Sequence, residues 1–198
     1  MRLLLIALVL VSSWGAYDGY VHRERHRPPG QIAADTPVQR DIVNGTPFQV
    51  GRYALTPRAY FATTARIIAK ERYRIDAGAE LMPLDLGIGW GLMSDTTLLD
   101  QLKLSQRGRF LHWSASKQPS VPWDEINRSA ANLHIIPADE AIAKRLYGAR
   151  VGDVVEIEGE LVDVTRGDGW FIKTSLTRED IGGGACEVIY VRSVNLRR

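Results

Sequence analysis

The stretch GDVVEIEGELVDV, residues 152–164, decides the fold class of this chain. Apolar and acidic residues alternate through its first half, so Val155, Ile157 and Leu161 share one face of an extended strand. Beyond Leu161 the alternation slips by one residue. A β-bulge produces such a slip, and a nearby mid-strand glycine, Gly159, is typical of a bent strand. The pattern predicts a curved strand with one buried face.

Further patterns along the chain extend this prediction to the whole domain. GWFIKTS (169–175) and CEVIYVRSVNL (186–196) indicate two more strands, and alternate apolar residues indicate another at 59–73. ADEAIAKRLYGA, 138–149, has apolar residues at helical spacing and a glycine near its end. We therefore expect a β-rich α+β fold with a single domain. Its core is predicted to be a small curved sheet or partly open barrel, SH3-like or OB-like, with a few short helices.

The glycine-rich segment LMPLDLGIGWGLMSD, 81–95, is harder to assign. It is too broken for a regular helix and too apolar for an exposed loop, so it is predicted to be a packed irregular segment. Short helices are predicted within 95–103 and 123–130, and short strands within 107–115 and 132–137.

The composition is that of an ordinary globular protein. The chain has 198 residues, of which 45% are hydrophobic and 24% charged, enough for one domain plus a tail. A net charge of +2 is too balanced to indicate nucleic-acid binding. The single cysteine excludes an internal disulfide framework and a multi-cysteine zinc site. We expect no cofactor.

The N-terminus predicts membrane targeting. One arginine precedes an uncharged, largely apolar stretch from Leu3 to Tyr17. A helix of this length covers about 22 Å, less than the hydrocarbon core of about 30 Å. Residues 1–21 are therefore either a cleaved signal peptide or a membrane anchor, which places the protein at the bacterial inner membrane or in the periplasm. Residues 22–46 are polar and rich in turn formers, which indicates a tether to a globular domain at 47–198.

Four segments resemble, in the same order, the motifs of a family of uncharacterised bacterial proteins with an N-terminal hydrophobic segment. They are LMPLDLGIGWGLMSD, LSQRGRF, SAANLHIIPADE and GGGACEVIYV, against DLxLGWGxMSD, ISQxxR, SANMHxIPA and GACExxYV. The resemblance covers most of residues 28–195, and Ile88, Leu104, Ala131 and Leu133 depart from the motifs. It implies one domain close to a membrane, and it assigns no catalytic residue.

Cys186 has two interpretations. With His134 and Asn132 upstream, it has the residue types of a cysteine hydrolase, which needs a thiolate, a base and a group that orients the base. The glycines at 182–184 would offer backbone N–H groups to an oxyanion. However, Cys186 also begins a predicted strand, and cysteine is among the most frequently buried residues. We predict a packed thiol and keep the hydrolase as the alternative.

Metal and ligand sites are weakly indicated. A zinc site from His134, Asp139, Cys186 and Glu187 has no recognised ligand spacing, so no metal is predicted. Several residues in or beside the glycine-rich segments either stabilise loops or line a binding groove. These candidate binding residues are Trp90, Asp95, Arg109, Arg178 and Glu187.

The function predicted from the sequence is a membrane-targeted interaction or assembly module of the cell envelope without enzymatic activity, acting through a protein partner. The first alternative is a cysteine-dependent hydrolase using Cys186 and His134. The second is an OB-type nucleic-acid binder, which ranks last because the basic residues are dispersed.

Overall fold

The computed structural model describes residues 24–177 and 185–197. The predicted signal peptide or anchor, 1–21, lies outside these ranges. No helix within them is long and apolar enough to cross a membrane. The elements are β1 (Val38–Asp41), β2 (Phe48–Val50), β3 (Tyr53–Arg72), β4 (Leu84–Gly89), η1 (Gly91–Ser94), α2 (Thr96–Leu99), β5 (Lys103–Arg107), β6 (Phe110–Ser114), α3 (Trp123–Arg128), β7 (Ala130–Pro137), α4 (Glu140–Tyr147), β8 (Val154–Arg166), β9 (Phe171–Ile172) and β10 (Glu187–Arg197).

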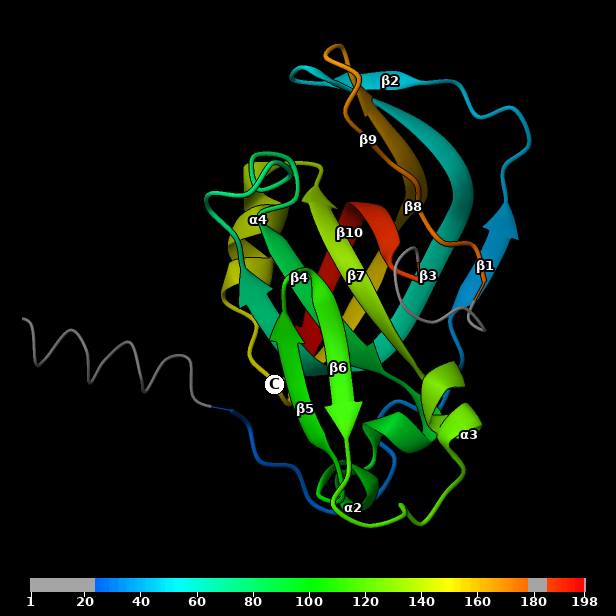
Figure 1. The fold of residues 1–198 in the computed structure, drawn as a ribbon, viewed down its shortest axis with the longest axis vertical. Helices are drawn as coiled ribbons and strands as arrows, with labels where there is room; N and C mark the ends of the chain where they lie inside the picture. The colour runs from blue at the N-terminus through cyan, green and yellow to red at the C-terminus, as the bar shows by residue number, and fades with distance from the viewer. Residues whose placement is uncertain (1–23, 178–184, 198) are drawn as a thin grey trace, which may run out of the picture.

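Five of these strands form a closed ring in the order β3-β4-β7-β10-β8, because β8 also pairs with β3. All neighbours in the ring are antiparallel except β7 and β10, which are parallel. β1 and β2 pair with β3, and β9 pairs with the end of β8. Figure 1 shows β3 as the long curved strand that runs along one side of the molecule. The prediction of a β-rich α+β fold with a few short helices is confirmed.

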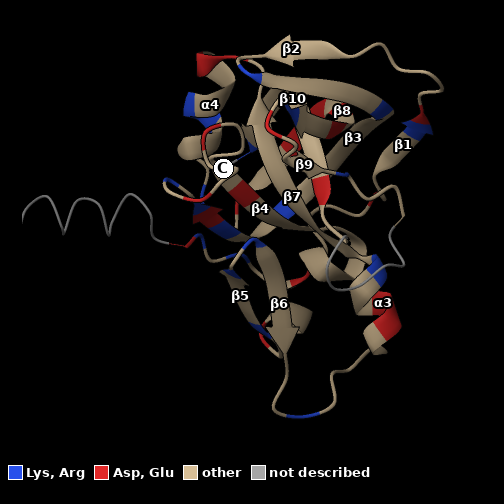
Figure 2. Ribbon diagram, turned by 45° about the horizontal axis from the view of Figure 1, so that its top comes forward, with Lys and Arg blue, Asp and Glu red and all other residues tan. Residues whose placement is uncertain are grey.

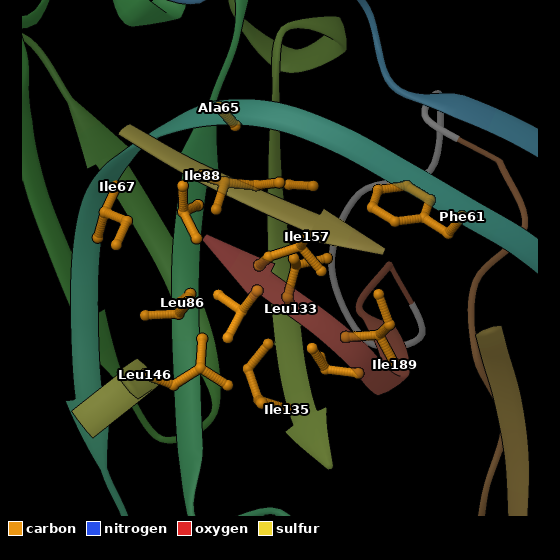
Figure 3. Close-up of a cluster of buried hydrophobic side chains, with 14 of the residues drawn as sticks. Phe61, Ala65, Ile67, Leu86, Ile88, Leu133, Ile135, Leu146, Ile157 and Ile189 are labelled. Carbon is orange, nitrogen blue, oxygen red and sulfur yellow. The ribbon is translucent and has the colours of Figure 1, made fainter. Parts of the chain in front are cut away.

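The interior of the ring is the main hydrophobic core. Figure 3 shows apolar side chains from the ring strands converging there, with Phe61, Ile88, Leu133, Ile157 and Ile189 among them. These residues alternate along their strands with outward-facing ones, as the side-chain period of two requires.

The slip in the pattern of β8 marks a change of buried face. Val155, Ile157 and Leu161 belong to the main core, whereas Val162 and Val164 belong to a second cluster. The first half of β8 therefore faces the ring interior, and its second half is buried on the opposite face.

The irregular residues that accompany this change lie on the strands beside β8. The register with β8 shifts between Pro57 and Ala59 of β3, and it shifts again within β10. Gly159 has a different role from the predicted bend. A Cβ atom at this position would lie 2.1 Å from the backbone oxygen of Tyr190, so glycine permits β8 and β10 to approach each other closely.

Helix α4 packs against the main core, as its sequence predicts. Ile142 and Leu146, four residues apart, are buried in the main core. The Asp139 side chain caps the helix by accepting a hydrogen bond from Ile142 N at 2.8 Å. At the other end, Lys70 Nζ donates to the carbonyl oxygens of Tyr147 and Ala149, at 2.8 and 2.6 Å. This cation complements the negative end of the helix.

The prediction of an irregular segment at 81–95 is wrong in its central part. Leu84–Gly89 forms β4, every residue of which is buried. A strand buried on both faces has a nearly continuous apolar sequence, which hides its period of two. The glycine at Gly87 makes room for a neighbouring hairpin, because a Cβ there would lie 2.8 Å from a methyl group of Leu111.

Residues 24–46, expected to form a polar tether, lie along the domain at several points. Arg25 N donates to Val151 O at 2.8 Å, and Gly30 N donates to the Asp95 carboxylate at 2.9 Å. β1 lies in the sheet beside β3. These contacts are made largely through backbone groups, which a polar, turn-rich sequence does not reveal.

Candidate functional site

Several residues predicted to be functional meet on the outer face of β4 and β7. The register pairs Asp85 with His134, and Gly87 with Asn132, so the four residues are cross-strand neighbours on that face. The hairpin of β5 and β6 lies over this face, and the start of β10 lies beside it. We call the polar residues gathered here the Asp85 cluster: Asp85, Arg109, Asn132, His134 and Cys186.

The β5–β6 hairpin brings Arg109 into this cluster. Its two-residue turn, Gly108 and Arg109, has φ of 59° and 74°. Positive φ at both positions is typical of a type I′ hairpin turn, and it is unusual for arginine. The contacts of Arg109 offset this cost. Nη1 donates to Asp85 at 2.9 Å, while Nε and Nη2 donate to Asp76 at 3.0 and 2.8 Å. The guanidinium also lies 3.7 Å from the ring centroid of Tyr73.

Asp85 is the buried anion of the cluster, with an exposed fraction of 0%. The same oxygen, Oδ1, that accepts from Arg109 lies 2.9 Å from Nδ1 of His134. Its other oxygen, Oδ2, has no hydrogen-bond partner among the described residues. One buried carboxylate is therefore shared by two cationic side chains when His134 is protonated.

The surroundings of His134 favour its charged form. Burial has the largest effect and lowers the pKa of His134, but the interactions with Asp85 and Cys186 outweigh it and raise the pKa to about 9. The imidazole is therefore protonated at neutral pH. The Asp85 carboxylate and the His134 imidazolium form an ion pair within a closed environment, where screening by salt is weak.

Cys186 is buried, with 9% of its surface exposed, but its surroundings are polar. Asn132 Nδ2 donates to the sulfur at 3.2 Å, and the thiol donates to Arg109 O at 3.7 Å. Asn132 Nδ2 also donates to Arg109 O at 2.7 Å, and its Oδ1 accepts from Gln106 at 2.8 Å. The thiol is thus part of a network that fixes the hairpin to the ring.

The other candidate binding residues have separate places. Trp90 is 2% exposed and belongs to the main core. Asp95 caps α2, and hydrogen bonds from the backbone N–H groups of Gly30 and Thr97 lower its pKa. Glu187 begins β10 and is buried. Arg178 lies outside the described residues.

Sequence reasoning missed Asp85, Asp76 and Gln106. Asp85 carries a recognisable signal, since it is the sole charged residue of the apolar run at 81–93. A charged residue inside such a run indicates a buried and paired group. Within 24–177 and 185–197, no group of three or more histidine, cysteine or acidic residues is arranged to hold a metal ion. Asp139, once considered as a ligand, caps α4 instead.

Comparison with known proteins gives no relative from which a role is transferred. No protein-family model, no curated protein and no solved structure matches the chain.

Proposed function

We propose that this chain is a membrane-targeted interaction or assembly module of the cell envelope, built on an OB-type barrel. The order of the ring strands supports the fold assignment. Numbered along the chain, these strands pair as 1-2-3-5-4 and back to 1, with α4 between the third and the fourth. This is the order of a five-stranded Greek-key barrel of the OB type.

The covered ligand face argues for an interaction module over a nucleic-acid binder. OB-type proteins commonly bind oligonucleotides on the face of the second and third strands, here β4 and β7. In this chain the β5–β6 hairpin occupies that face, with Leu111 against Gly87 and Arg109 bonded to Asp85. Acidic and basic residues are also spread over the whole ribbon (Figure 2). Such interspersed charges in the described residues do not favour the binding of a nucleic-acid backbone.

The observation that carries the proposal is an exposed aromatic and basic groove beside the β8–β9 hairpin. Phe171 is 65% exposed at the sheet edge, next to Trp170. The Arg166 guanidinium stacks 5.2 Å from the Trp170 ring centroid, and Arg58 and Lys173 also line the groove. Tryptophan, arginine and other aromatic residues are enriched where proteins bind each other. Arg58 and Arg166 are already paired with Asp163 and Asp168, so the partner segment we expect is mainly apolar, with an acidic residue near Lys173.

Site-specific photo-crosslinking in cells tests this interface. A photoreactive residue in place of Phe171 should give one discrete protein adduct. The same residue in place of Val43, which is 84% exposed elsewhere, should not. The interface is refuted if Phe171 gives no adduct, or if both positions give the same adducts.

Cell fractionation tests the membrane part of the proposal. Deleting residues 1–20 should move the protein from the membrane or periplasmic fraction into the cytosol, because the apolar segment is then lost. Finding the full chain in the cytosolic fraction would contradict membrane targeting.

A cysteine hydrolase is the second candidate, and one observation favours it. Asp85 Oδ1 lies 2.9 Å from His134 Nδ1, and interactions with Asp85 and Cys186 raise the pKa of His134. A cysteine hydrolase needs a base beside its nucleophile and a group that orients the base.

Thiol labelling separates the two candidates. In the module, DTNB reacts slowly with Cys186 in the folded protein and quickly after denaturation. In the hydrolase, labelling of the folded protein is fast and His134→Ala slows it. The exposed variant His112→Ala is the matched control, and it should leave the rate unchanged in both cases.

A further inference from the structure

A second cleft, away from the Asp85 cluster, lies between the N-terminal segment, β3, α2 and β5. Its volume is about 560 Å³, within the range of small-ligand sites. Both apolar and polar side chains line it. Among the lining residues are Arg66, Ile68, Leu99, Leu104, Ser105 and Gln106.

Arg66 is the unusual residue of this cleft. It is only 3% exposed, yet it makes no ion pair with a carboxylate in the described part of the chain. Nη1 donates to Ser94 O at 3.2 Å and to Thr96 Oγ1 at 2.7 Å. Burial lowers the pKa of the guanidinium, although the carboxylates of Glu24, Asp100 and Asp95, which do not pair with it directly, act in the opposite direction. A buried charge normally has an opposite charge as its partner.

The unused donors of Arg66 have a definite geometry. Its Nε is buried without a hydrogen-bond partner, and Nη2 donates no hydrogen bond within the described residues. Nε has almost no exposed surface, so Nη2 is the donor that an anion in the cleft can reach. The side chain is thus fixed by Nη1 and offers Nη2 to one oxygen of a carboxylate.

The other lining residues indicate which further chemical group the ligand has besides the anion. Gln106 Oε1 is a buried acceptor with no partner among the described residues. Glu24, Glu71 and Asp100 also line the cleft and disfavour a multiply charged anion such as phosphate. The same carboxylates can accept hydrogen bonds from a cationic amine, whereas the Gln106 oxygen is covered. Ile68, Leu99 and Leu104 offer apolar contacts.

We propose that this cleft binds a small molecule with a carboxylate and an amine, of which an amino acid is the simplest. The carboxylate accepts a hydrogen bond from Nη2 of Arg66, and the amine faces the acidic rim. This site is separate from the groove at Phe171, and Gln106, which donates to Asn132, links it to the Asp85 cluster.

Ligand-observed NMR on the full chain in detergent tests the proposal. The probe is a mixture of the twenty L-amino acids, each at about 1 mM. At least one should bind saturably, with a Kd near or below about 1 mM. Its amide and its N-acetyl derivative should each bind at least about tenfold more weakly, a difference of about 1.4 kcal/mol. The first derivative lacks the carboxylate and the second lacks the amine.

Two variants locate the binding. Arg66→Lys keeps the positive charge but loses the Nη2 donor, and Ser105→Trp fills the cleft from an exposed strand position. Both should weaken binding at least about tenfold, whereas Ser114→Trp, exposed on β6, should not. If Arg66→Lys fails to fold, Ser105→Trp decides. The proposal is overturned if no amino acid binds, if the derivatives bind equally well, or if binding survives Ser105→Trp.

Discussion

Raising the pH from about 6 to about 8 should lower the free energy of unfolding, because it removes a proton that His134 holds in the folded protein. The Asp85 and Cys186 interactions raise the pKa of His134 from 6.5 to about 9. A difference of about 2.5 in pKa corresponds to about 3 kcal/mol of stability. This contribution is complete below the unfolded value of 6.5 and is lost as the pH rises through about 9. About 2 kcal/mol should disappear between pH values of about 6 and about 8.

The upper limit of this pH range is set by Lys70. Burial, followed by the charge of Arg72, lowers the pKa of Lys70 from 10.5 to about 8. Between about 8 and 10.5 the unfolded chain binds more protons at Lys70 than the folded chain does, so stability rises with pH there. The two effects have opposite signs and overlap above about pH 8. Measurements below this value report mainly on His134.

The assay is urea unfolding of the full chain in detergent, followed by tryptophan fluorescence at several pH values. His134→Gln removes the titration and keeps a side chain that donates hydrogen bonds, so its stability should change little over the range. His112→Gln is the control, because His112 is exposed on β6, and it should keep the slope of the original protein. Equal slopes in His134→Gln and the original protein would refute the reasoning, as would a flat profile for the original protein.

Three more predictions follow from close contacts and hydrogen bonds. Gly159→Val should reduce thermal stability by about 3 kcal/mol or more, because its Cβ meets Tyr190 O, whereas Gly167→Val, in open space, should cost little. Cys186→Ala should lower the free energy of urea unfolding by about 1–3 kcal/mol, because one Asn132 N–H loses its acceptor. Cys186→Ser should lower it less, and equal losses for the two variants would exclude the hydrogen bond as the cause. Asp95→Ala should cost about 1 kcal/mol and speed hydrogen exchange in the N-terminal segment, and unchanged exchange would contradict its bond to that segment.

Local patterns in the sequence were sufficient for several elements of the fold. The period of two at 59–73 and 154–164 and the helical spacing at 138–149 correspond to β3, β8 and α4. These patterns are readable because each element has one buried face. β4 was missed because it is buried on both faces, and its glycines serve contacts with residues distant in the sequence.

The sequence by itself determined the fold class and named Cys186, His134 and Asn132 as one possible set, because residue types and short periodicities are local properties. Only the tertiary structure decided that β3 pairs with β8 and closes the ring. Only the register of β4 with β7 placed Asp85 opposite His134, and only the docked hairpin brought Arg109 to Asp85. Such pairings depend on strand order and on closure over long stretches of chain. Their free energy comes from the joint burial of many residues, which no single segment of the sequence specifies.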